Sequence, residues 1–114
     1  MILSVPELVT QAKNSVDCVS AAQAFTHKNA TFIDVREPAE TAASPVTNSI
    51  NIPRGVLEMN IAKYCTDGDM EIYVHCASGG RATLAAEQLQ RIGYNNVKAI
   101  SCDHNNVCLA QKNQ

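Results

Sequence analysis

Long apolar runs are missing from this 114-residue sequence, and so is the basic start followed by an apolar core that marks a signal peptide. We therefore expect no membrane partner and a location in the cytoplasm. Clusters of lysine and arginine are also missing, and the formal net charge is −2 with a pI of about 5.8. This charge balance excludes nucleic acid and anionic membrane surfaces as main partners.

Cysteine pairs are another missing feature, because no two of the five cysteines stand in a CxxC arrangement. An odd number of cysteines without that spacing fits neither a disulfide framework nor a zinc ribbon. His27 and His104 have no partner at a metal-ligand spacing, and we interpret both as surface residues. We therefore expect reduced thiols in a reducing compartment, with no bound metal and no cofactor.

Repeats, low-complexity tracts and flexible linkers do not occur, so nothing in the sequence marks the start of a second domain. Apolar residues make up 46% of the chain, which is an ordinary value for a globular protein and argues against disorder. We expect one domain over residues 16–114, preceded by a helical N-terminal extension, residues 1–15, that packs on it.

Strand-like and helix-like segments alternate along this domain. β-branched and aromatic residues predict strands over residues 16–19, 31–35, 49–52, 70–75 and 97–100. Apolar periodicity and capping residues predict helices over residues 5–14, 21–26, 39–43, 55–64, 81–92 and 104–110. The alternation predicts an α/β fold with a mostly parallel sheet that helices cover on both faces.

The most informative segment is the loop of residues 76–81, between a predicted strand and a predicted helix. Cys76 follows the strand, Gly79 and Gly80 allow a tight turn, and Arg81 closes the loop. Backbone N–H groups in such a turn can converge on one point, and the helix N-terminus adds a partial positive charge. Both effects favour the thiolate of Cys76, which is the nucleophilic form of cysteine.

Together with three other segments, this loop resembles the single-domain rhodaneses, a family of sulfurtransferases. The four segments are residues 32–37 (FIDVRE), 50–55 (INIPRG), 76–81 (CASGGR) and 89–96 (LQRIGYNN). The resemblance implies a three-layer α/β/α fold around a mostly parallel five-stranded sheet. It also implies that Cys76 takes sulfane sulfur from a small anion such as thiosulfate or a persulfide. Cys76 then passes the sulfur to cyanide, a thiol or an acceptor protein, while Arg81 braces the loop.

Other parts of the loop are expected to bind the substrate. The backbone N–H groups of Ala77, Ser78, Gly79 and Gly80 are placed to stabilise the negative charge of the thiolate and of the persulfide. The Ser78 hydroxyl either donates to the persulfide or only stabilises the turn. These residues are therefore our candidates for substrate binding.

Three further residues near the same edge of the sheet are candidates for supporting roles. We interpret Asp34 and Arg36 as residues that shape the site through hydrogen bonds. Arg54 either supplies a cation to the substrate or is a surface arginine. His75 precedes the nucleophile, so strand alternation turns its side chain to the opposite face, and we do not expect it to act as a general base.

The chain departs from the family pattern at several positions. Many relatives carry a basic residue directly after the cysteine, whereas this chain has Ala77, so a cation that would attract thiosulfate is missing there. Residues 44–46 (SPV) replace a Gly-His-Ile run, and residues 102–105 (CDHN) replace a Gly-Gly pair. Cys102 thereby becomes a candidate resolving thiol. The remaining cysteines are predicted to be buried or half-buried packing residues: Cys18, Cys65 and Cys108.

Two other functions stay open. Cysteine phosphatases and arsenate reductases hold a thiolate in a similar loop, but they place five residues between cysteine and arginine, and this chain has four. A shorter loop suits one added sulfur atom better than a phosphate. The second alternative is a non-catalytic or slow rhodanese-like module that carries sulfur between proteins. Such modules often lack the cysteine that is present here.

Overall fold

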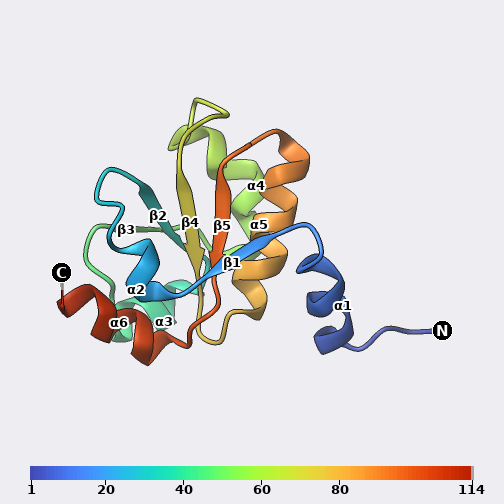
Figure 1. Cartoon of the computed structure of the whole chain (residues 1–114), viewed down its shortest axis with the longest axis horizontal. Coiled ribbons are helices and arrows are strands. Elements are labelled where there is room, and N and C mark those ends of the chain that lie inside the picture. Colours follow the sequence, from blue (N-terminus) through green and yellow to red (C-terminus); the bar gives the residue numbers. More distant parts are fainter. Residues whose placement is uncertain (114) are drawn as a thin grey trace.

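The computed structural model describes residues 1–113, which form a five-stranded parallel sheet with helices on both faces (Figure 1). The strands lie in the order β1-β5-β4-β2-β3. Their bounds are Asp17–Val19 (β1), Thr31–Asp34 (β2), Ser49–Asn51 (β3), Ile72–His75 (β4) and Val97–Ile100 (β5). All four strand pairs are parallel, so the strands end at one edge of the sheet. The three-layer α/β/α fold predicted from the sequence is confirmed.

Within residues 1–113, six helices and two short 3₁₀ turns precede, connect or follow the strands. They are α1 (Val5–Ala12), α2 (Ala21–Ala24), α3 (Pro38–Ala43), η1 (Arg54–Val56), α4 (Leu57–Asn60), η2 (Ile61–Lys63), α5 (Gly80–Ile92) and α6 (His104–Lys112). Helices α4 and α5 cover one face of the sheet and bury Leu57 and Leu89 there. Helices α2 and α6 lie together on the other face, where Ala24 and Val107 are buried.

Side-chain alternation along β4 separates these two buried clusters. Ile72, Val74 and Cys76 face the cluster beneath α4 and α5. Tyr73 faces the cluster beneath α2 and α6, and His75, two residues further on, lies on the same side as Tyr73. The central strand therefore places the cysteine on one side of the sheet and the histidine on the other, as predicted.

Local capping signals account for several helix boundaries. Ser20 and Gln23 form a capping box at the start of α2, and Asp103 caps α6 by accepting a hydrogen bond from the Asn106 N–H. Gly93 ends α5 with a φ of 130°, a conformation that favours glycine.

The prediction of one helix over residues 55–64 was wrong, because three short elements, η1, α4 and η2, follow one another there. Leu57 and Ile61 are buried as the periodicity indicated, whereas Tyr64 is exposed. The Asn60 side-chain amide donates to the Val56 carbonyl oxygen at 2.9 Å. This contact lies within the single turn of α4, whose N-cap is Val56.

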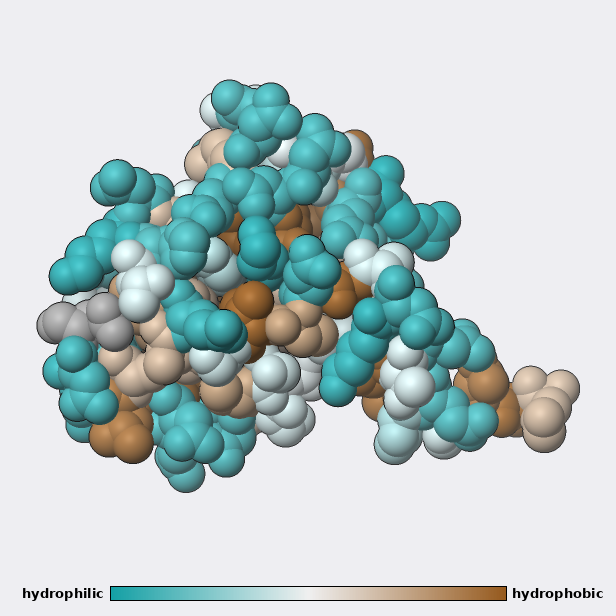
Figure 2. Space-filling model, viewed as in Figure 1, coloured by the Kyte–Doolittle hydropathy of each residue, from teal (hydrophilic) through white to brown (hydrophobic). Residues whose placement is uncertain are grey.

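The N-terminal helix α1 lies outside the sheet and packs against α5 (Figure 1). A capping box between Ser4 and Glu7 starts it, and Ala12 is buried. The residues before it are exposed, and Figure 2 shows apolar atoms at this end of the chain. The division into an extension and a domain at residue 16 stays a prediction. None of the helices formed by residues 1–113 has the length and apolar character needed to cross a membrane.

The cysteine predictions hold in part. Cys65 is buried, and Cys102 and Cys108 are half-buried. Cys18 is exposed, so its prediction as a packing residue was wrong. The reason is its place on β1, which pairs only with β5 and therefore forms an edge of the sheet with one side uncovered.

Candidate active site

The loop that joins β4 to α5 is shaped by a glycine that no other residue can replace without strain. Gly79 has a φ of 94°, in the left-handed region. A Cβ atom at this position would also stand 3.0 Å from the Ser101 carbonyl oxygen, beyond the end of β5. The loop therefore turns tightly against the neighbouring strand, and α5 begins directly after it at Gly80.

Two backbone N–H groups of this turn point at the cysteine sulfur. The Cys76 Sγ accepts hydrogen bonds from the Gly79 N–H at 3.1 Å and from the Ala82 N–H at 3.2 Å. The side chain is fully buried. Donors fixed in this way stabilise negative charge on the atom they face, with no reorganisation needed when that charge forms. The His104 N–H holds the loop from outside by donating to the Ala77 carbonyl oxygen at 2.8 Å.

Arg81 connects the loop to α3 through a bidentate ion pair with Glu40. Its Nη1 and Nη2 lie 2.7 and 2.9 Å from the two carboxylate oxygens. Hydrogen bonding to Arg81 lowers the pKa of Glu40 to about 2, so the pair is ionised at neutral pH. Sequence reasoning missed Glu40 as the partner. The signal was an acidic residue in the short helix after β2, the strand next to β4.

Asp34 and Arg36 form a buried network at the end of β2. The Arg36 Nη2 donates to the Asp34 carboxylate at 2.8 Å and to the Ser44 carbonyl oxygen at 2.7 Å. Arg36 also donates to the Glu40 carbonyl oxygen, and the Thr41 hydroxyl donates to Asp34. Burial alone would raise the pKa of Asp34, but the hydrogen bonds from Arg36 and the charges of His75 and Arg36 together outweigh it and leave that pKa lowered. This network anchors the chain segment that carries Glu40.

His75 is buried on the opposite side of the sheet from the sulfur. Its Nε2 lies 2.6 Å from the Ser49 hydroxyl oxygen. Burial lowers the pKa of His75 to about 4, and the Asp34 carboxylate, 3.9 Å away, offsets this effect only in part. His75 is therefore neutral at physiological pH and packs as an uncharged side chain.

His104 was predicted to be a surface residue, and this was wrong. Its Nε2 contacts the Ser44 hydroxyl at 2.8 Å and the Cys108 Sγ at 3.3 Å, and the side chain is half-buried. Burial lowers the pKa of His104. The prediction failed because the first residue of α6 packs against the segment after α3, which is 60 residues away in sequence.

Two of the candidate residues, Arg54 and Cys102, contact residues outside the loop of Cys76. The Arg54 Nη1 lies 3.0 Å from the Glu58 carboxylate, one helical turn away. Cys102 packs with the cluster beneath α2 and α6, and its Sγ accepts a hydrogen bond from the Ala21 N–H at 3.3 Å. Substrate binding by Arg54 stays a prediction. For Cys102 the contacts indicate a packing and capping role.

A hollow of about 360 Å³ borders the loop on the side of α1. Ser78, Gly79 and Gly80 line one wall, and Val9 and Lys13 belong to the facing wall. Ser78 is exposed and forms no hydrogen bond through its hydroxyl within residues 1–113. Lys13 has no ion-pair partner in the part of the chain that the structure describes. Sequence reasoning missed Lys13, because periodicity cannot show which loop a distant helix reaches.

The site thus has a buried cysteine at the carboxyl edge of a parallel sheet, and backbone N–H groups of a tight turn donate to its sulfur. This geometry is that of proteins that use a cysteine thiolate as nucleophile. Comparison with known families places the chain within that class: residues 18–107 match the family described as Rhodanese-like domain. The chain belongs to the rhodanese-like domain family. No group of three or more histidine, cysteine or acidic side chains within residues 1–113 is placed to hold a metal ion.

Individual relatives agree with this assignment. A protein of Allochromatium vinosum named sulfurtransferase is 28% identical over 85 residues, which cover 74% of this chain and 78% of that protein. The structure of a rhodanese-related protein from Thermoplasma volcanium is 30% identical with a TM-score of 0.70, covering 80% of this chain and 89% of the other. A Rhodopseudomonas palustris protein of unknown function, described as a possible tyrosine phosphatase, has a TM-score of 0.82 at 21% identity over 96% and 92% of the chains. At that identity the last likeness concerns the fold alone.

Proposed function

We propose that this protein is a sulfurtransferase that carries sulfane sulfur as a persulfide on Cys76. The observation that carries the proposal is the pair of backbone N–H groups directed at the Cys76 Sγ, 3.1 and 3.2 Å away. A thiolate and a persulfide are both anions. In the thiolate the charge lies on Sγ, which these two donors face, and in the persulfide it lies on the outer sulfur, which the other N–H groups of the loop are proposed to stabilise. Membership of the rhodanese-like family and the Allochromatium vinosum sulfurtransferase support this function.

The reaction has two displacement steps, and neither needs an external oxidant or reductant. The Cys76 thiolate attacks the outer sulfur of thiosulfate, the S–S bond of the donor breaks, and sulfite leaves with the bonding electron pair. A thiophile such as cyanide or a thiolate then attacks the outer sulfur of the persulfide. The Cys76 thiolate leaves with the electron pair of the second S–S bond, and the enzyme returns to its starting form.

In this proposal an anionic donor is recognised by a charge beside the loop. Arg36, Arg54 and Arg81 each form an ion pair with a carboxylate. Lys13 lines the hollow beside the loop without such a partner among residues 1–113. In this proposal Lys13 takes the place of the basic residue that Ala77 replaces, while Arg81 holds the loop in shape.

The function is tested by offering sulfur donors and an aryl phosphate to the same preparation. With cyanide as acceptor, we expect thiocyanate to form from thiosulfate or from glutathione persulfide. We expect no hydrolysis of para-nitrophenyl phosphate, because four residues between Cys76 and Arg81 form a smaller loop than a phosphate needs.

Three outcomes separate the functions. Thiocyanate formation without phosphate release supports the sulfurtransferase. Persulfide formation on Cys76 with very slow transfer to cyanide supports a protein-to-protein sulfur carrier instead. Phosphate release that disappears in Cys76→Ser, with no sulfur transfer from either donor, contradicts the proposal.

A further inference from the structure

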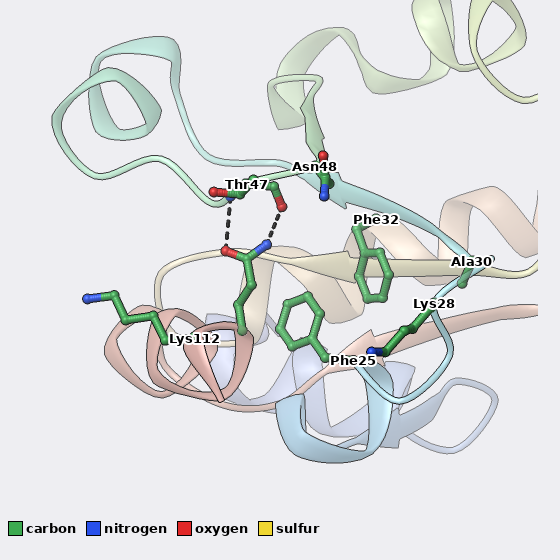
Figure 3. Close-up of a pocket in the computed structure, with 8 residues that line it drawn as sticks. Phe25, Lys28, Ala30, Phe32, Thr47, Asn48 and Lys112 are labelled. Atoms are coloured by element: carbon green, nitrogen blue, oxygen red, sulfur yellow. Dashed lines mark hydrogen bonds between the residues drawn. The ribbon is translucent and has the colours of Figure 1, made fainter. Parts of the chain in front are cut away.

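A second cavity, of about 430 Å³, lies between the segments around α2, the start of β3 and the end of α6 (Figure 3). Its volume falls in the range of small-molecule binding sites. Helices α2 and α6 cover the face of the sheet that the Cys76 side chain does not occupy. The cavity is therefore separate from the candidate active site.

Aromatic rings form one wall of the cavity. The Phe25 and Phe32 rings stack with their centroids 4.7 Å apart and an interplanar angle of 21°. Phe32 stacks in turn on Tyr73, with 5.4 Å between the centroids. Phe25 and Phe32 both line the cavity, where Figure 3 shows their rings side by side. Because Phe25 and Tyr73 take the two faces of Phe32, the ring edge of Phe32 is left for the cavity, and an edge-to-face contact favours an aromatic partner there.

Two lysines, Lys28 and Lys112, also line the cavity. Within residues 1–113, neither forms an ion pair, and no aspartate or glutamate is among the lining residues. Figure 3 shows the Lys28 amino group beside Phe25, and the Lys112 side chain further away on α6 with its amino group directed away from the two rings. The chain as a whole has a net charge of −2, whereas the charged residues that line this cavity are both cations. The cavity is thus complementary to an anion.

Hydrogen bonds fasten the wall between α6 and the turn before β3. The Thr47 N–H donates to the Gln111 Oε1 at 3.0 Å, and the Gln111 side-chain amide donates to the Thr47 carbonyl oxygen. Asn48 follows with a φ of 63°, which completes the turn into β3. Because both ends of the Gln111 amide are bound, the cavity has its shape before any ligand arrives.

We infer that this cavity binds a flat aromatic anion. In this arrangement the ring packs against Phe25 and the edge of Phe32. A carboxylate, sulfonate or phosphate group on the ring contacts Lys28, and the exposed Lys112 side chain turns toward the same group. The inference is independent of the proposed sulfur transfer, since none of these residues belongs to the loop of Cys76.

The test compares two fluorescent probes that differ by one charged group. Anilinonaphthalene sulfonate carries the anionic group, and phenylnaphthylamine is its uncharged counterpart. We expect saturable one-site binding of the sulfonate to the folded protein and weaker binding of the uncharged probe. Lys28→Gln and Lys112→Gln should each lower the affinity for the sulfonate probe by about two- to fivefold, as expected for a partly exposed ion pair.

A matched control and a map of the contact site complete the test. Lys63 is exposed and does not line the cavity, so Lys63→Gln should bind the sulfonate as the parent does. Thermal unfolding checks that each variant is folded, and amide chemical shifts should change at Phe25 and Gln111. Equal affinity for the two probes, parent-like binding by the double variant Lys28→Gln/Lys112→Gln, or shift changes centred on residues 76–81 would each overturn the inference.

Discussion

Replacing Cys76 by serine should reduce sulfur transfer to the rate seen without enzyme. Serine is close to cysteine in size, and its oxygen can accept the hydrogen bonds that Gly79 and Ala82 donate to the sulfur. A serine hydroxyl is a poor nucleophile without a general base, and the buried, neutral His75 is turned to the opposite face. The rate of thiocyanate formation measures the effect.

Cys102→Ser provides the matched control for this variant. It makes the same chemical change at a half-buried cysteine whose sulfur also accepts a backbone hydrogen bond, from Ala21. We expect unchanged turnover with cyanide and with thiol acceptors. Equal losses in the Cys76 and Cys102 variants would contradict the role proposed for Cys76, and a loss confined to thiol acceptors in Cys102→Ser would restore Cys102 as a resolving thiol.

Replacing Asp34 by alanine should lower the free energy of unfolding by about 3–5 kcal/mol, the typical cost of removing one partner from a buried ion pair. The Arg36 side chain is 3% exposed, so its charge would stay buried with only carbonyl acceptors. Urea unfolding at neutral pH measures the change. Asp34→Asn, which keeps the size and removes the charge, supplies a milder variant if the alanine protein does not fold.

The same variant has a predicted pH dependence. The pKa of Asp34 in the folded protein lies below its ordinary value of 3.8. The ionised Asp34 carboxylate therefore contributes its full share to the free energy of unfolding at any pH above 3.8. This share is lost as the pH falls through the lower pKa of the folded protein. The stability difference between parent and Asp34→Ala should be constant near neutral pH and shrink in acid.

An exposed pair serves as the comparison. Glu58→Gln removes the partner of Arg54, whose side chain is 27% exposed. Surface pairs of this kind contribute at most about 1 kcal/mol, so Glu58→Gln should change the free energy of unfolding by no more than that. Equal effects of Asp34→Ala and Glu58→Gln would show that burial does not govern the Asp34–Arg36 pair.

The predictable parts of the fold were those that local sequence determines. β-branched strands and capping residues such as Ser20 and Asp103 act within a few residues, so the five strands and most of the helices were predicted correctly. Residues 55–64 were not, because periodicity shows which side chains are buried but not where a 3₁₀ turn replaces an α-helical turn. The exposure of Cys18 depends on the order of strands, which the local pattern does not contain.

The same distinction holds for the site. The turn of residues 76–81 could be predicted because Gly79 and the helix start are adjacent to Cys76. The contacts that hold this turn come from far along the chain: Glu40 is 41 residues from Arg81, and the His104 N–H reaches the Ala77 carbonyl oxygen. Such partners depend on how the strands assemble, so a single sequence does not identify them.

Sulfur transfer through this site requires that the Cys76 sulfur accept one further sulfur atom. Its most direct test is the intact mass of the protein after treatment with thiosulfate, and separately with glutathione persulfide, followed by removal of the donor. We predict a gain of about 32 Da, one sulfur atom, that is reversed by cyanide and does not occur in Cys76→Ser. An unchanged mass with both donors, or the same gain in Cys76→Ser, would show that Cys76 does not carry the sulfur.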